Sequence, residues 1–343
     1  MENLKWFSFS FVLKFLYMNM NINFKKKTMN KLKVLCIHHT DLDGAGSAAC
    51  VGLKHINDEV TYRLYNYGWP LEEKEFYGYD LIYAVDVSFN QSSPWVYQIP
   101  NLIWIDHHKT ALEYEDQNPW MHQIPGKRAI GKGACELTWE YLFPNTQCPL
   151  FIQYLSTYDV WDKNRFNWEY IEEIEYGAKQ IFGISPVAII DFIQRGENPE
   201  TLRETGRNIL AYLEKSGRSK LKNNGFYIHD FFGYRVMALN TLDFSSMSFL
   251  SYYTTEHFDI MMPFAIVPDE NELGKVFVRC SLYSENPNVD VSVIAKKFSG
   301  GGHRLSSGFQ TSLETLQEIL KCSGPLKLYM NSIGFKGNEP RRA

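Results

Sequence analysis

The sequence lacks several features that would assign it to a class at once. None of its six cysteines is spaced as Cys-X-X-Cys, and such scattered cysteines favour reduced, mostly buried thiols in a cytoplasmic protein. The 35 basic residues do not outnumber the 39 acidic ones, so the net charge of -4 excludes a broadly basic nucleic-acid coat, and a polyanion would have to bind in a local patch. Internal repeats and low-complexity tracts are also absent, and the 45% of hydrophobic residues exclude disorder and coiled coil.

The sequence also lacks an apolar run long enough to cross a membrane. The run from Trp6 to Tyr17 has about twelve residues, whereas a helix needs roughly 20 to span a bilayer. Lysines 25–27 follow this run instead of preceding it, unlike the order in a secretory signal. We therefore expect no membrane partner and interpret residues 1–28 as a poorly structured extension ahead of Met29. A weak amphipathic anchor is the alternative.

Three short apolar runs end in aspartate or histidine. They are residues 32–37 before His38–Gly44, residues 81–85 before Asp86, and residues 102–105 before Asp106–His108. Apolar runs without polar alternation, separated by long connections, predict a parallel sheet covered on both faces. Ligand groups in such sheets gather at the carboxyl ends of the strands. We therefore predict an α/β domain over residues 29–184.

The length of 343 residues predicts a second domain, because single cores rarely exceed roughly 250–300 residues. A charged, helix-compatible stretch predicts a helical linker over residues 185–224. Strand-like runs and one helix pattern then predict a smaller α/β domain over residues 225–335, followed by a tail over residues 336–343.

A set of acids and histidines carries the chemical signal. The set is Asp41, Asp43, Asp86, Asp106, Asp159, His39, His107 and His108. Carboxylates ~4 Å apart repel by about 1 kcal/mol in water and by more when buried, so either their pKa values rise or cations neutralise them. Mixed nitrogen and oxygen ligands suit Mn²⁺, Co²⁺, Fe²⁺ or Zn²⁺. One aspartate after a strand is usually a helix N-cap, but that does not explain the whole set. Asp162 competes with Asp159.

In order and spacing, these residues resemble the four motifs of the DHH phosphoesterases, over residues ~32–310. Gly300-Gly301-Gly302-His303 is similar to the glycine-rich loop of that family's associated C-terminal domain. The first motif and Ser281-Leu282-Tyr283-Ser284 are most similar to NrnB-type nano-RNases, also described as cyclic-nucleotide phosphodiesterases. RecJ-type exonucleases are more distant relatives. The resemblance implies an α/β fold with an N-terminal parallel-sheet DHH domain, a smaller C-terminal domain and an active site in the cleft between them.

The resemblance also implies roles for the matched residues. It implies two divalent cations, most of all Mn²⁺, with Mg²⁺ or Co²⁺ as alternatives. The implied ligands are His39, Asp41 and Asp86 for one cation, and Asp43, Asp86, His107 and Asp159 for the other. Asp86 would bridge the two cations. His108 would face the substrate phosphate, and Asp106 would orient a histidine.

Seven further residues are candidates for substrate binding: Gly300, Gly301, Gly302, His303, Arg279, Tyr283 and Lys132. Glycines let backbone N–H groups approach a ligand closely, although a plain glycine turn is the alternative. Tyr283 stands where NrnA-type relatives carry arginine; it can stack on a base, with core packing as the alternative. Lys132 lies in a basic loop with Lys127 and Arg128 that would supply a local positive patch or else be solvated.

The sequence therefore predicts a two-metal phosphodiesterase that hydrolyses short single-stranded RNA or DNA to nucleoside 5′-monophosphates. The alternatives are a cyclic (di)nucleotide phosphodiesterase, an inorganic pyrophosphatase, and a nucleic-acid-binding scaffold without activity. Pyrophosphatase is disfavoured because the cationic Ser-Arg/Lys motif of those enzymes is absent. The sequence leaves a homodimer open.

Overall fold

Two β-sheets organise the part of the chain that the computed structural model describes. That part is residues 31–338 without 68, 90–92, 243, 250–251 and 270–271. The interpretation of residues 1–28 therefore falls outside the described residues, as do residues 339–343 of the predicted tail. Within the described ranges, the helices are all too short or too polar to cross a bilayer.

The first sheet is parallel throughout and has five strands among the described residues. In the order β2-β1-β3-β4-β5 they are β2 (Glu59–Tyr65), β1 (Lys33–His39), β3 (Leu81–Val85), β4 (Leu102–Asp106) and β5 (Gly126–Arg128). The three apolar runs identified in the sequence are β1, β3 and β4, which occupy the middle of the sheet. Their carboxyl ends therefore lie side by side at one edge.

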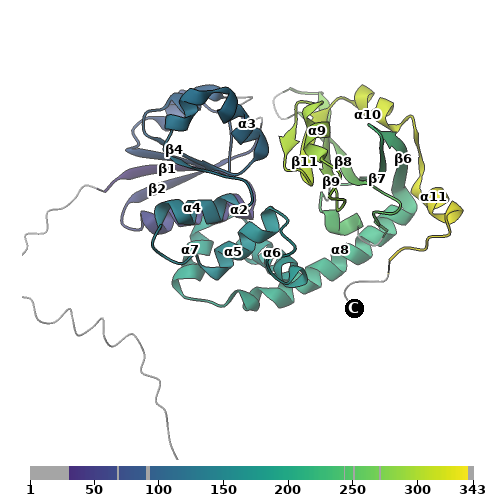
Figure 1. Ribbon diagram of the computed structural model, residues 1–343, viewed down its shortest axis with the longest axis horizontal. Helices are drawn as coiled ribbons and strands as arrows, with labels where there is room; N and C mark the ends of the chain where they lie inside the picture. Colours follow the sequence, from purple (N-terminus) through teal and green to yellow (C-terminus); the bar gives the residue numbers. More distant parts are fainter. Residues whose placement is uncertain are drawn as a thin grey trace, which may run out of the picture. The chain divides into compact units, whose positions relative to one another are not determined.

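Helices cover both faces of this sheet (Figure 1). One face packs on α2 (Leu42–Lys54) and α4 (Ala134–Leu142), in a core that contains Val34, Ala48 and Leu137. The other face packs on α3 (Lys109–Gln117), in a core that contains Ile37 and Ala111. The remaining elements are η1 (Glu73–Phe76), η2 (Pro94–Gln98), η3 (Pro119–Gln123), α5 (Leu150–Asp159), α6 (Trp168–Phe182) and α7 (Pro186–Gln194). Burial on both faces explains why the central strands show no polar alternation.

The stretch of residues 185–224, for which we predict a linker, is helical. It comprises α7, η4 (Pro199–Leu202) and α8 (Arg203–Asn224), and α8 packs along α6. The two helices approach closely at Gly206, where a Cβ atom would lie 1.7 Å from the carbonyl oxygen of Glu173. The buried Glu173 carboxylate accepts hydrogen bonds from Arg203 and Arg207 on α8. This buried carboxylate fixes α8 on α6.

The second sheet is mixed and has seven strands among the described residues, in the order β10-β11-β9-β8-β7-β6-β12. Its elements are β6 (Gly225–Phe231), β7 (Tyr234–Asn240), η5 (Ser246–Phe249), β8 (Ile260–Pro268), β9 (Val276–Tyr283), α9 (Val291–Lys296), β10 (Gly301–Gly302), β11 (Ser306–Thr311), α10 (Leu313–Leu320), β12 (Ser323–Pro325) and α11 (Leu326–Ser332). Side chains of α9 and α10 enter the core on one face, and side chains of α8 and α11 enter the core on the other.

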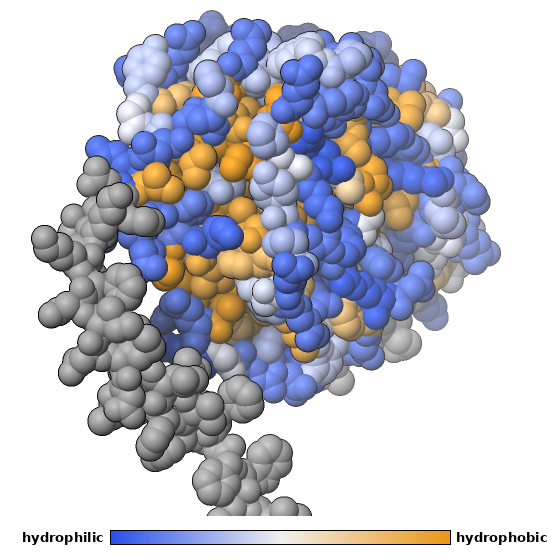
Figure 2. Space-filling model, turned by 60° about the vertical axis from the view of Figure 1, so that its left-hand side comes forward, coloured by the Kyte–Doolittle hydropathy of each residue, from blue (hydrophilic) through white to orange (hydrophobic). Residues whose placement is uncertain are grey.

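These observations confirm the predicted fold class, an α/β protein with a parallel N-terminal sheet and a second, mixed sheet packed on helices. Both sheets belong to one unit that begins at Leu32. Figure 2 shows one face of the molecule, where hydrophilic side chains dominate and apolar patches lie between them. The proposed domain boundaries stay predictions. In the predicted tail, Asn338 Nδ2 donates to the carbonyl oxygen of Tyr253, so residues 336–338 are held by the second domain.

Candidate metal centre

The first motif bends sharply from β1 into α2. Asp41 is the N-cap of α2, because its Oδ1 accepts from the backbone N–H of Gly44 at 2.9 Å. Its Oδ2 lies 2.6 Å from Nδ1 of His39, the last residue of β1. A Cβ atom on Gly44 would lie 2.5 Å from the carbonyl oxygen of His39, so only glycine fits this bend. Asp41 is thus both a helix cap and a partner of His39.

The next two strands deliver Asp86 and Asp106 to the same edge. Asp86 follows β3 with φ 60, in the left-handed region that non-glycine residues seldom adopt. Asp106 ends β4, and its Oδ1 accepts from the backbone N–H groups of His107 (2.7 Å) and His108 (3.1 Å). The same oxygen accepts from the His108 ring nitrogen Nδ1 at 2.8 Å. The histidine that Asp106 orients is therefore His108.

Three carboxylates converge on one imidazole nitrogen. Nε2 of His107 lies 3.4 Å from Asp43 Oδ2, 3.2 Å from Asp86 Oδ1 and 3.2 Å from Asp159 Oδ2. Ligand atoms around a cation with bonds of ~2.1 Å lie roughly 3.0–3.4 Å from one another. Asp43, His107 and Asp159 together can therefore hold a metal ion.

A second group adjoins the first through Asp86. His39, Asp41 and Asp86 offer ligand atoms to one common point. Nδ1 of His39 lies 3.8 Å from Oδ2 of Asp86, while the other Asp86 oxygen faces His107. The structure thus brings all six predicted metal ligands together, with Asp86 between the two groups.

The buried acids of this centre lack sufficient partners within the protein. Asp86 Oδ2, Asp159 Oδ2 and His107 Nδ1 are buried and form no hydrogen bond with the described residues. Burial and the neighbouring acids, Asp41 and Asp43 among them, raise the pKa of Asp86 and of Asp159 well above the usual range. Burial and the neighbouring His108 lower the pKa of His107, which favours the neutral form that binds metals. These residues fit divalent cations, which would neutralise the acids and bind the orphaned oxygens of Asp86 and Asp159.

Asp43 is held in place by the amino end of α4. Its carboxylate accepts from the backbone N–H groups of Ala134 (2.6 Å) and Cys135 (3.0 Å). The residue before them is Gly133, where a Cβ atom would lie 2.7 Å from Asp43 Oδ1 and 2.8 Å from the Cα atom of Ser156. Gly133 is therefore required for this close approach. The two backbone hydrogen bonds fix which Asp43 oxygen faces His107.

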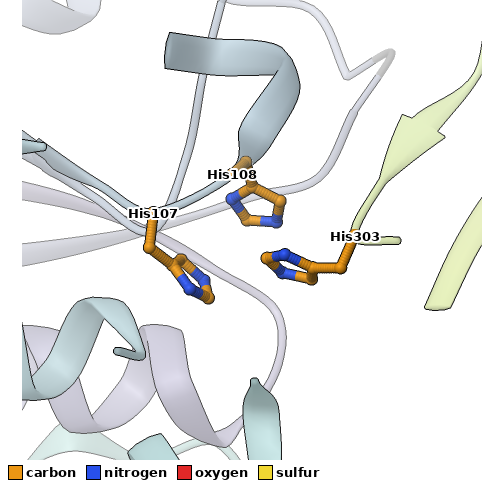
Figure 3. Close-up of side chains that lie close together, drawn as sticks. All are labelled: His107, His108 and His303. Atoms are coloured by element: carbon orange, nitrogen blue, oxygen red, sulfur yellow. The ribbon is translucent and has the colours of Figure 1, made fainter. Parts of the chain in front are cut away.

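The second sheet carries His303 to the centre, between β10 and β11. Figure 3 shows the His303 side chain reaching toward His107 and His108. The His303 ring stacks on His108 with centroids 4.7 Å apart and lies 4.6 Å from the His107 ring. Gly301 lies beside Thr110 of α3, whose Cγ2 would be 3.4 Å from an added Cβ atom. Glycines are needed at Gly300 and Gly302, where a Cβ atom would lie 2.1 Å from the Gly308 carbonyl oxygen and 2.7 Å from that of Ser306, respectively.

Two of the other candidate residues, Lys132 and Arg279, are basic. The amino group of Lys132 forms ion pairs with Glu136 and Glu140, and Glu140 also binds Lys127 at 2.5 Å. This acidic pair offsets the charge of both lysines in the loop, for which a local positive patch and a solvated loop were the alternatives. Arg279 is exposed on β9. The roles of Lys132 and Arg279 in substrate binding stay predictions.

The competitor of Asp159 and the arginine that follows His303 are also located. Asp162, the competitor of Asp159, accepts from the backbone N–H of Asn164 at 3.2 Å and belongs to none of the candidate metal groups among the described residues. Arg304 donates to the backbone carbonyl oxygens of Pro287 and Val289. Arg304 is therefore committed to its own domain.

The sequence analysis missed a pocket beside Asp159. Its volume is about 480 Å³, and it is lined by residues of both domains. The lining includes Tyr158, Asp159, Trp161, Tyr176, Lys179, Phe244 and Tyr283. The aromatic residues around Asp159 in the stretch Tyr158-Asp159-Val160-Trp161 were the available signal.

The fold and the centre together define an α/β protein with a histidine–aspartate site that fits divalent cations. No protein-family model matches the chain. The chain is 26% identical over 221 residues to the uncharacterized protein R106 of Acanthamoeba polyphaga mimivirus, a match that covers 61% of this chain and 48% of that protein. The chain therefore spans about half the length of this curated relative.

The chain is also similar to several solved structures. One is the DHH domain of a protein described as a member of a family of ribosomal proteins, with a TM-score of 0.49, 13% identity, and coverage of 90% of this chain and 88% of that chain. Another is the pGpG-specific phosphodiesterase PggH from Vibrio cholerae, with a TM-score of 0.44, 12% identity, and coverage of 88% and 99%. A third is RecJ from Thermus thermophilus in complex with Mn²⁺, with a TM-score of 0.43, 12% identity, and coverage of 91% and 53%.

Proposed function

We propose that this protein is a metal-dependent phosphodiesterase that hydrolyses short oligonucleotides to nucleoside 5′-monophosphates. One observation carries the proposal: three carboxylate oxygens lie within 3.4 Å of Nε2 of His107, and one of these acids is shared with the group of His39 and Asp41. One carboxylate would be enough to form a hydrogen bond with Nε2 of His107, whereas three carboxylates face it. This set suits two adjacent cations, and the order of its motifs resembles that of the DHH phosphoesterases.

The residues divide into those that hold cations and those that act on the substrate. His39, Asp41 and Asp86 would hold one cation, and Asp43, Asp86, His107 and Asp159 the other. Divalent cations bound at such sites activate water and stabilise the charge of a phosphoryl group during in-line displacement.

His108 is the catalytic residue in this proposal. Its Nδ1 donates to Asp106, so the opposite ring nitrogen Nε2 is presented for a hydrogen bond to the phosphate or to the departing oxygen. Asp106 is a positioning residue, because its Oδ1 accepts from the His108 ring and also from the backbone N–H groups of His107 and His108. His303 stacks on that ring and excludes water from one face of it.

Choice of substrate belongs to the second domain. The hairpin of β10 and β11 carries His303 to the centre, and Gly301 of this hairpin lies beside Thr110 of α3. We propose Mn²⁺ as the cation in use, since mixed imidazole and carboxylate ligands suit it. The free cysteines of the described residues are consistent with a reducing compartment such as the cytoplasm.

The test is one assay series with Mn²⁺ on purified protein. The substrates are dinucleotides, five-mers, a cyclic dinucleotide, cyclic AMP and pyrophosphate, each scored for release of 5′-monophosphate or phosphate. We expect oligonucleotides of two to five residues to be cut fastest. Exclusive cleavage of the cyclic dinucleotide, or of pyrophosphate, would replace the proposed substrate by that alternative.

A matched pair of histidine variants tests the centre itself. His107→Ala should lower bound Mn²⁺ and turnover by at least about 100-fold, because it removes the nitrogen that three acids face. His122→Ala, on η3 at the surface, should change neither. Full activity of His107→Ala would refute the assignment of the metal centre. If His107→Ala loses Mn²⁺ binding but the wild type hydrolyses none of the substrates, the protein is a metal-binding scaffold without this activity.

A further inference from the structure

The pocket beside Asp159 is not explained by the metal centre. Asp159 belongs to both, so the pocket opens directly next to the proposed cations. Its volume of about 480 Å³ lies within the ~300–1,000 Å³ typical of sites for small ligands. The walls come from α5 and α6 on one side and from the second domain on the other.

Aromatic rings dominate these walls. The Trp161 and Tyr283 rings are 28° from parallel, with centroids 6.5 Å apart. Two van der Waals contacts of ~3.5 Å require about 7 Å between flanking rings, so a small movement of Tyr283 admits a planar group. Behind them, Tyr158 stacks on Trp168 at 5.6 Å and 4°. The pocket is therefore shaped for a flat, aromatic ligand.

Trp161 is held in an unusual conformation. Its φ is 59, in the left-handed region where a helix normally ends with glycine. Its indole Nε1–H is buried and donates no hydrogen bond to the described residues. Strained residues with unmet hydrogen bonds occur preferentially at functional sites. An acceptor supplied by a ligand would satisfy this N–H.

The charge of the pocket disfavours a phosphate there. Lys179 is its only cation among the described lining residues, and Nζ of Lys179 lies 3.0 Å from Glu175. The same nitrogen lies 5.2 Å from the ring centroids of Tyr158 and Tyr176. Lys179 is thus paired within the protein. A neutral heteroaromatic ring with polar edges fits better than an anion.

We propose that this pocket binds the nucleobase of the nucleotide whose phosphate lies at the metal centre, with Trp161 as its stacking platform. The inference rests on the proposed function for the position of the phosphate. The bound base lies between Trp161 and Tyr283, and the indole N–H donates to an acceptor on its edge. Stacking on aromatic side chains tolerates every base, so the pocket selects nucleotides over other phosphate esters without reading sequence.

The test compares two ligands that differ only in the base. AMP and ribose 5-phosphate are titrated into Mn²⁺-loaded full-length protein by calorimetry, so that the result does not depend on turnover. We expect AMP to bind the wild type about 5- to 150-fold more tightly than ribose 5-phosphate, as one stacked base predicts. Trp161→Ala should bring this ratio to about 1, whereas Trp161→Phe should retain most of it.

Two further variants complete the design. Trp161→Gly removes the ring and suits the positive φ, so it tests the same ratio if Trp161→Ala folds poorly. Trp120→Ala removes an exposed tryptophan of η3 and should keep the wild-type ratio. Equal affinity of the wild type for the two ligands, or a wild-type ratio in both Trp161→Ala and Trp161→Gly, would overturn the inference. If the preference for AMP over ribose 5-phosphate depends on Trp161 but the protein cleaves no phosphodiester, the base-binding pocket is upheld and the proposed function is refuted.

Discussion

Replacing the Asp86 carboxylate with an amide should stabilise the metal-free protein and abolish its stabilisation by Mn²⁺. Asp86 is 1% exposed and lies among other acids, and its pKa is raised by burial and by Asp41, Asp43 and Asp159. Two unit charges 4 Å apart interact by about 4 kcal/mol at an effective dielectric constant of 20. Protonating a carboxyl of ordinary pKa ~3.9 at pH 7 costs a similar ~4 kcal/mol. Asp86→Asn avoids either cost, and asparagine tolerates the φ of 60 at this position.

Thermal unfolding in EDTA and in Mn²⁺ measures both effects. In EDTA, Asp86→Asn should unfold several degrees above the wild type, because 1 kcal/mol corresponds to roughly 1–2 °C in a chain of 343 residues. In Mn²⁺ at about 100 times its Kd, the wild type should gain ~2.7 kcal/mol and Asp86→Asn should gain far less. Asp116→Asn, a surface change on α3, should behave as the wild type does. If Asp86→Asn melts below the wild type in EDTA, the repulsion among the buried acids is refuted. If Mn²⁺ raises the melting temperature of Asp86→Asn as much as that of the wild type, Asp86 is not a metal ligand.

Two further predictions concern the ion pairs that hold α8 on α6 and the glycine that lets α4 approach Asp43. Burial raises the pKa of Glu173, but Arg203 and Arg207 of α8 more than offset this effect and hold it below its usual range. The ionised carboxylate therefore stabilises the fold above about pH 4.3, and this contribution is lost as the pH falls. Glu173→Gln should therefore lose about 1–3 kcal/mol in urea unfolding at pH 7 and little at pH 3, and equal losses at both would contradict this origin. Gly133→Ala should weaken Mn²⁺ binding about 10- to 100-fold in calorimetry by displacing Asp43, whereas Gly324→Ala, with open space around it, should not.

The central strands could be predicted from the sequence, but the edge strands could not. β1, β3 and β4 are covered on both faces, so their apolar runs are continuous and easily recognised. β2 lies at the edge of the sheet, and exposed residues alternate with half-buried ones along most of it. β5 is the three residues Gly126–Arg128, two of them basic. The signal that identifies a buried strand is weak in both.

The metal centre was predictable because its residues occur in ordered motifs at strand ends, where topology alone brings them together. Their detailed partners depend on contacts that no motif encodes. Asp43 is fixed by backbone N–H groups of α4, about 90 positions along the chain. The neutralisation of Lys132 was in principle visible, since Glu136 and Glu140 follow it at spacings of four and eight on a helix. The pocket beside Asp159 was not visible, because Tyr176, Phe244 and Tyr283 come from three distant segments.

Backbone strain also gathers where the chemistry is proposed. Four non-glycine residues have positive φ among the described residues: Asp86, Trp161, Phe232 and Ser299. Phe232 is explained by its hairpin, because Phe232 and Gly233 both have positive φ in the tight turn between β6 and β7. The other three are Asp86 in the centre, Trp161 in the pocket and Ser299 just before the glycine loop. Each costs of the order of 1–3 kcal/mol, and the cores on both faces of the two sheets offset that cost. A sequence carries no signal for φ at aspartate or tryptophan, so this part of the site could be found only from the structure.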